Sequence, residues 1–144
     1  AKMDSPVQIA VDTIGMGGGV ADRLRELGLP CVDVNVSESV AMNQSAARLR
    51  DELWLAIKTW LETRAVRLPK DDDLRAELIG PTYSFTSNGK LKVEGKAEMK
   101  RRGMRSPDLA DALGLSFAGE QAYVGGRAAR WISGKPLLRR VSIC

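Results

Sequence analysis

Residues 8–24 read Gln8-Ile9-Ala10-Val11-Asp12-Thr13-Ile14-Gly15-Met16-Gly17-Gly18-Gly19-Val20-Ala21-Asp22-Arg23-Leu24. A short apolar run ends in a carboxylate, and a glycine cluster and a helical pattern follow it, which predicts a strand, a tight turn and a helix. Ligands of open α/β sheets collect outside the carboxyl ends of strands, so Asp12 lies where a ligand would bind. The same carboxylate could instead accept hydrogen bonds from the backbone of the following turn. Both roles of Asp12 stay open at this point.

The composition favours one domain with an unevenly distributed charge. The chain has 144 residues and a net charge of +4, so the charge of the whole chain argues only weakly for a polyanionic partner. The distribution is more informative, because residues 90–105 hold seven cations and two acids. Histidine is absent, which removes the commonest general base and every His-ligated metal site.

Two cysteines, Cys31 and Cys144, form neither a disulfide framework nor a CxxC zinc pair. No apolar stretch is long enough to span a bilayer, and no basic-then-apolar leader begins the chain. We therefore expect a reducing, cytoplasmic setting without a membrane.

The periodicity along the chain predicts an α/β fold. A strand at 7–12, a helix from 18 or 19 to about 27 and a strand at 31–36 form a βαβ unit with parallel strands. An amphipathic helix over about 46–64 follows, and its Trp54 and Trp60 are interpreted as core or interface anchors. Later elements are a short helix after 71–73, a hairpin whose strands flank 87–90, a basic helix over 96–102, and a helix with Ser106 as N-cap and Pro107 at its first position. Residues 119–144 are expected to form a basic, loosely ordered tail.

Three carboxylates suggest a metal site. Asp108 and Asp111 lie three residues apart and hence on one helix face, and with Asp12 they offer the hard oxygen ligands that select Mg²⁺ or Mn²⁺. Acids in a first helical turn also suit the helix dipole, so a structural role stays open. The neighbouring cations could hold a phosphate backbone; they are Lys90, Lys92, Lys96, Lys100, Arg101, Arg102 and Arg105. The glycine loop approaches a dinucleotide fingerprint, but Val20 stands where the third glycine should be.

The order of these motifs carries a family resemblance. Residues 11–24, the helix around 48–54, Leu68-Pro69, residues 80–83, residues 96–103 and residues 106–112 together resemble the C-terminal nuclease domain of phage terminase large subunits. The resemblance covers about residues 5–118, and we expect 1–118 to be a partial domain of this kind. It rests on order and spacing, because no single motif is specific.

The resemblance implies an RNase H-like fold that cuts concatemeric viral DNA during packaging with two divalent metals, Mg²⁺ or Mn²⁺. By position, Asp12 resembles the family's second acid, and the third falls at Asp108 or Asp111, with Asp108 favoured. Lys96 and Lys100 resemble basic positions near the DNA path. The implied partners are double-stranded DNA and, through a full-length protein, the portal and the small terminase subunit.

The sequence also departs from the family's pattern. The family's first acid lies on a central strand, and nothing before Val7 supplies it, so we expect a mixed sheet that lacks its first strands. The ATP-driven motor is missing too, and the chain resembles a fragment, for example of a prophage. A sheet without its central strand exposes an edge, which predicts a homodimer or a strand borrowed from another chain.

Three functions follow from these observations. The first is a metal-dependent endonuclease domain, catalytically incomplete as written, with Asp12, Asp108 and Asp111 as its catalytic and metal-binding residues. The second is a DNA-binding or assembly module of a phage packaging machine without turnover. The third is a nucleotide-binding domain that uses the glycine turn.

Overall fold

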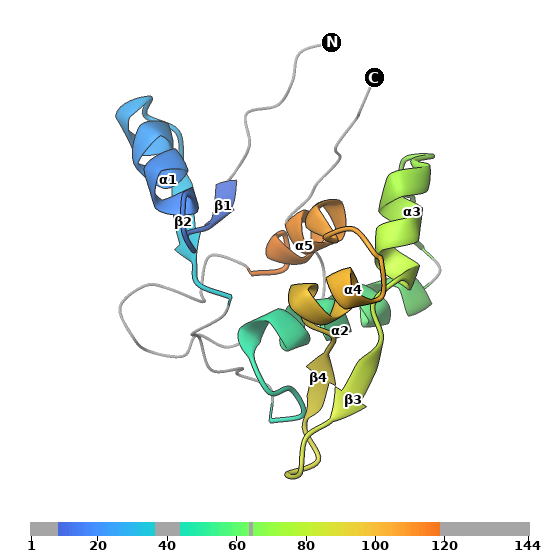
Figure 1. Ribbon diagram of the computed structural model, residues 1–144. Coiled ribbons are helices and arrows are strands. Elements are labelled where there is room, and N and C mark those ends of the chain that lie inside the picture. Colours follow the sequence, from blue (N-terminus) through green and yellow to red (C-terminus); the bar gives the residue numbers. More distant parts are fainter. Residues whose placement is uncertain (1–8, 37–43, 64, 119–144) are drawn as a thin grey trace.

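A computed structural model describes residues 9–36, 44–63 and 65–118 of the chain (Figure 1). The tail expected at 119–144 lies outside these residues. The elements, in chain order, are β1 (Ile9–Asp12), α1 (Gly17–Glu26), β2 (Cys31–Val34), α2 (Leu49–Glu62), α3 (Asp72–Ile79), β3 (Tyr83–Phe85), β4 (Leu91–Val93), α4 (Lys96–Arg101) and α5 (Asp108–Leu115). In Figure 1, β1, α1 and β2 form one end of the molecule, and the remaining elements gather at the other.

The first three elements form the predicted βαβ unit. β1 and β2 pair in parallel, with Ile9 opposite Cys31 and Asp12 opposite Val34. Gly15 adopts a φ of +66°, and a Cβ at Gly17 would lie 1.7 Å from the carbonyl oxygen of Asp12. Only glycine permits both this turn and so close an approach of α1 to the strand. The glycine cluster therefore packs the helix start against the backbone of Asp12.

β3 and β4 form the predicted hairpin, but its loop is longer than a two-residue turn. Phe85 pairs with Leu91, and Thr86 N–H donates to the carbonyl of Lys90 at 2.8 Å, which leaves three loop residues, 87–89. Gly89 has a φ of +73°. This is the left-handed residue that three-residue hairpin loops require.

The α/β class is confirmed, but the two strand pairs do not join into one mixed sheet among the described residues. The outer edge of β4 is taken by other groups. Leu91 N–H donates to the carbonyl of Ser45 at 2.7 Å, and Val93 N–H donates to Asp51 Oδ1 at 2.8 Å. The outer edges of β1 and β2 pair with no other described strand, so the predicted pairing with another chain stays a prediction.

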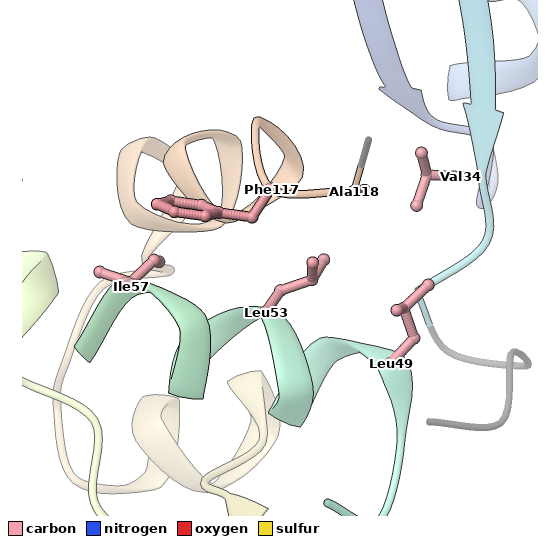
Figure 2. Close-up of a cluster of buried hydrophobic side chains, with 6 residues drawn as sticks. All are labelled: Val34, Leu49, Leu53, Ile57, Phe117 and Ala118. Atoms are coloured by element: carbon pink, nitrogen blue, oxygen red, sulfur yellow. The ribbon is translucent and has the colours of Figure 1, made fainter. Parts of the chain in front are cut away.

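The core forms where α2, α5 and β2 meet (Figure 2). Its six buried residues come from β2, from one face of α2 and from the segment that directly follows α5, and they are Val34, Leu49, Leu53, Ile57, Phe117 and Ala118. The α2 residues recur every four positions, as the sequence pattern predicts. Trp60 packs on the ring of Phe117 edge to face, with 5.6 Å between ring centroids, which confirms it as a core anchor.

The beginning of α5 differs from the sequence-based expectation, whereas the beginning of α3 agrees with it. Pro107, not Ser106, occupies the N-cap of α5, because its ψ of 60° is not helical and the Ser106 hydroxyl donates to Asp108 Oδ1 at 2.7 Å instead of capping the backbone. α3 begins as expected from its acids, since Asp71 accepts the backbone N–H of Leu74 at 2.9 Å. No helix within the described ranges is long and apolar enough to cross a membrane.

Replacing Ile57 by alanine is expected to lower the free energy of unfolding by roughly 2–5 kcal/mol, because the side chain is 2% exposed and its removal leaves a cavity between α2 and α5. Ile79→Ala is the matched control, since Ile79 is 76% exposed and its truncation should change the free energy by about 0.5 kcal/mol or less. Urea unfolding followed by circular dichroism measures both. Equal effects of the two substitutions would contradict this description of the core.

Candidate functional site

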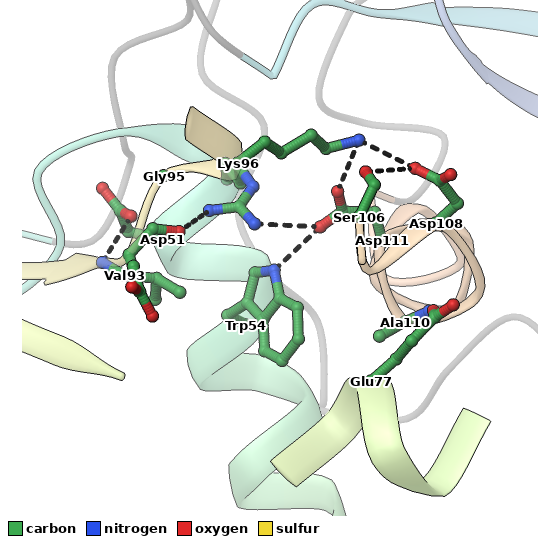
Figure 3. Close-up of polar contacts among 12 residues, drawn as sticks. Asp51, Trp54, Glu77, Val93, Gly95, Lys96, Ser106, Asp108, Ala110 and Asp111 are labelled. Carbon is green, nitrogen blue, oxygen red and sulfur yellow. Dashed lines mark hydrogen bonds and ion pairs between the residues drawn. The ribbon is translucent and has the colours of Figure 1, made fainter. Parts of the chain in front are cut away.

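Two carboxylates and one ammonium group meet between α4 and α5 (Figure 3). Lys96 Nζ lies 3.0 Å from Asp108 Oδ1 and 3.1 Å from Asp111 Oδ2. The spacing of three residues places both acids on one face of α5, as predicted, and Lys96 reaches them from the first position of α4. We call Lys96, Asp108 and Asp111 the Lys96 cluster.

Asp111 is the firmly held acid of the Lys96 cluster. Its Oδ1 accepts the indole N–H of Trp54 at 2.9 Å and lies 3.4 Å from Arg50 Nη2, both on α2. Its side chain is 22% exposed. One carboxylate oxygen is thus engaged by α2, and the other, Oδ2, faces Lys96.

Asp108 is more exposed and is held by short-range contacts. Its side chain is 74% exposed. The hydrogen bond from the Ser106 hydroxyl, and then that from Lys96, hold the pKa of the Asp108 carboxyl below its usual value. Burial alone would lower the pKa of Lys96, but its hydrogen bonds to Asp108 and Asp111 outweigh this effect and raise that pKa. The cluster is therefore an ion triad in which the Lys96 ammonium group bridges Asp108 and Asp111.

Asp12 lies apart from this triad. It ends β1, and its Oδ1 accepts the backbone N–H of Ile14 at 3.2 Å, which is the turn-forming contact that the sequence left open as an alternative. β1 contacts α5, the helix that carries the other two acids. In residues 9–36, 44–63 and 65–118, however, no group of three or more Cys, Asp and Glu side chains could hold a metal ion.

The donor set therefore fits a metal only in part. Two carboxylates that already share one ammonium group offer the oxygen ligands that a single hard cation prefers. A centre with two metals needs more ligands than the described residues bring together. The roles of Asp12, Asp108 and Asp111 in metal binding stay predictions.

The predicted DNA-binding cations fall into two groups. Arg102 is engaged in the fold, because its Nε donates to Glu94 Oε1 at 2.7 Å and its Nη2 donates to the carbonyl of Gly80 at 3.0 Å. Lys96 belongs to the ion triad. The others form no ion pair with a described acid: Lys90 is half-buried, and Lys92, Lys100, Arg101 and Arg105 are exposed. We call these last four the exposed cations.

The sequence pattern did not reveal that three residues of α2 support this site, namely Arg50, Asp51 and Trp54. Arg50 and Trp54 are four residues apart and so share one face of α2, with the Arg50 guanidinium 5.7 Å from the centre of the Trp54 ring. Buried Asp51 accepts the backbone N–H of Arg48 at 3.0 Å. Its place three residues after the helix boundary is a capping position, and this signal could have identified it.

No known family model and no curated protein matches the sequence. The nuclease domain of the large terminase subunit gp2 of bacterial virus Sf6, solved as a lysine-to-alanine variant with manganese, matches with a TM-score of 0.59 and 25% identity over 74% of this chain. The chain has the fold of a large terminase nuclease domain. A structure of the Sf6 variant with calcium gives a TM-score of 0.58 at 26% identity, and the domain without the substitution gives 0.57 at 25%.

The match covers only part of the Sf6 domain. This chain spans 62–63% of the length of those solved domains. The comparison confirms the RNase H-like fold that the sequence resemblance implied.

The Glu94–Arg102 pair makes a testable link between pH and stability. Hydrogen bonds to Glu94, from Arg102 first and then from the Thr82 backbone, hold its pKa below the usual value. A pKa lowered by folding stabilises the protein above the unfolded-state pKa, and this stabilisation is lost as the pH falls through the folded-state pKa. Arg102→Met should therefore destabilise the protein more at about pH 7 than at about pH 3.

Urea unfolding at both pH values measures this difference, and carboxyl NMR should show the pKa of Glu94 rising in the variant. Arg105→Met is the matched control, since Arg105 is exposed and pairs with no described acid. A destabilisation by Arg102→Met that is equal at both pH values would contradict the assigned ion pair.

Proposed function

We propose that this chain is part of a divalent-metal-dependent endonuclease domain that cuts double-stranded DNA when a phage genome is packaged. The observation that carries the proposal is the Lys96 cluster, a carboxylate pair around one cation, on a fold similar to a nuclease domain solved with manganese and with calcium. The proposed setting is the bacterial cytoplasm. The portal and the small terminase subunit are the proposed partners of the longer protein.

Each element of the site has a proposed part in the reaction. Asp111 and Asp108 would hold the divalent ion, Mg²⁺ or Mn²⁺, in the place that the Lys96 ammonium group takes here. The ion, when bound, supplies Lewis-acid activation of the phosphodiester and of the attacking water. Asp12 is a further proposed ligand, because its strand contacts α5. The exposed cations would hold the phosphate backbone.

Asp111→Asn is expected to abolish nicking of supercoiled plasmid by the purified chain in Mn²⁺. The neutral amide leaves Asp108 as the single anionic ligand beside Lys96. Gel electrophoresis of the plasmid measures the nicking. Asp73→Asn is the matched control, since Asp73 is an exposed acid in the first turn of α3, away from the cluster. Equal nicking by the wild type and Asp111→Asn would contradict the proposal.

A second function is a DNA-binding module of the packaging machine that does not cleave. The observation that favours it is the missing third ligand, because Asp12 does not join Asp108 and Asp111 in a group able to hold a metal. Retention of plasmid without nicking, in the wild type and in Asp111→Asn alike, would identify this module.

The exposed cations make a prediction that both functions share. The double variant Lys100→Gln/Arg105→Gln should bind duplex DNA more weakly whatever its sequence, and the slope of log K against log[salt] should fall by about 0.9 for each lost phosphate contact. Fluorescence anisotropy at several salt concentrations measures this. Lys58→Gln is the control, because Lys58 pairs with Glu62 on the exposed side of α2. An unchanged slope would exclude these two cations from the DNA interface.

A further inference from the structure

We propose that Trp54 is a positioning residue for metal binding, acting through Asp111. The inference rests on the proposed function, because it presumes that Asp111 is a metal ligand. It goes beyond that function by assigning a task to a side chain of α2 that carries no charge and has no atom able to ligate a metal ion.

The contact itself is specific. An indole N–H can only donate, and the Trp54 N–H donates to Asp111 Oδ1 at 2.9 Å across 57 residues of sequence. Because Oδ1 is taken by Trp54, the carboxylate presents Oδ2 to Lys96 at 3.1 Å (Figure 3). Rotation of the carboxylate about its Cβ–Cγ bond would break this hydrogen bond. Trp54 therefore fixes the plane of the carboxylate, with one oxygen toward the indole and the other toward the cation position.

Trp54 is in turn held by its neighbours. The Arg50 guanidinium lies 5.7 Å from the centre of the indole ring, and Arg50 Nη1 donates to the carbonyl of Glu94 at 3.1 Å. Arg50 Nη2 also lies 3.4 Å from Asp111 Oδ1. The Arg50 guanidinium therefore contacts both the indole ring of Trp54 and the carboxylate of Asp111. These contacts fix the direction of the indole N–H before any ion binds. Hydrogen-bonded partners of metal ligands typically change metal affinity by 10–100-fold when they are removed.

Asp108 offers a contrast on the same helix. Its partners are Ser106 and Lys96, neither of them on α2, and its side chain is 74% exposed. Asp111 is therefore the acid whose geometry is set before a metal arrives. This makes Asp111 the primary ligand and Asp108 the adaptable one, where the sequence favoured Asp108.

The test measures Mn²⁺ binding without DNA. Trp54→Phe keeps an aromatic ring for Arg50 and removes only the donor, and we expect its Mn²⁺ dissociation constant, measured by electron paramagnetic resonance, to rise about tenfold or more. Trp60→Phe is the matched control, because Trp60 lies on the same helix but packs on Phe117 in the core. Its dissociation constant should be unchanged. Melting temperatures establish that each variant folds, and Trp54→Leu, which also lacks a donor, replaces Trp54→Phe if the latter does not fold.

A double variant separates positioning from a general structural effect. In an Asp111→Asn background, Trp54→Phe should cause no further loss of Mn²⁺ affinity, because the residue through which it acts is already altered. The indole N–H resonance of Trp54 should also shift when Mg²⁺ is added, whereas that of Trp60 should not. These readouts follow the Asp111 contact and not the stability of the protein.

The outcomes distinguish the two proposals. If Asp111→Asn weakens Mn²⁺ binding and Trp54→Phe does not, the positioning role is overturned and the proposed function stands. If Asp111→Asn binds Mn²⁺ as the wild type does, Asp111 is not a ligand and both proposals are overturned. If Trp54→Phe and Trp60→Phe weaken binding equally, the effect is one of packing, and the positioning role is overturned.

Discussion

The buried carboxylate of Asp51 fixes the two parts of the molecule between which the candidate site lies. One oxygen accepts the backbone N–H of Val93 on β4, and the other accepts that of Arg48 at the beginning of α2. Asp51 is only 3% exposed, and a buried carboxylate without hydrogen-bond partners would strongly destabilise the fold. β4 ends three residues before Lys96, and α2 carries Trp54. Asp51 thus joins the two segments that carry the Lys96 ammonium group and the Trp54 indole, both of which reach Asp111.

The site that results is balanced in charge without a bound ion. Two acids and one ammonium group, with Arg50 beside them, leave no isolated charge at the junction of α2, α4 and α5. The half-buried carboxylate of Asp111 has hydrogen-bond and ion-pair partners at both oxygens, and these hold its orientation. The cost of assembling the acids is thus offset within the fold. A metal ion that bound as proposed would displace an ammonium group from two carboxylates that the fold already holds together.

The sequence predicts the local features of this fold well and its long-range contacts poorly. Alternating residues around Asn88-Gly89 specify the hairpin, and the three-residue spacing of Asp108 and Asp111 specifies a shared helix face, because both depend only on neighbours along the chain. The hydrogen bond from Trp54 to Asp111 leaves no such trace, since a Trp on an apolar stripe reads as core. Arg102 likewise reads as one more cation of a basic run, whereas its partner Glu94 lies across the turn into α4. Periodicity alone predicted only an α/β fold. The RNase H-like fold was predicted by the order of the motifs, which resembles that of terminase nuclease domains.

The βαβ unit is attached to the main core by few buried side chains, and this should favour its local unfolding. Within the described residues, Val34 is the only fully buried side chain that this unit contributes to the main cluster, whereas α2 and α5 share several. Regions with few buried contacts exchange their amide protons through opening events that cost less than global unfolding. β1 and β2 should therefore form a separate cooperative unit with faster exchange than α2 and α5. Asp12 would then be carried by the less stable of two bodies, and its position relative to Asp111 could change by a movement of that body without unfolding the helices.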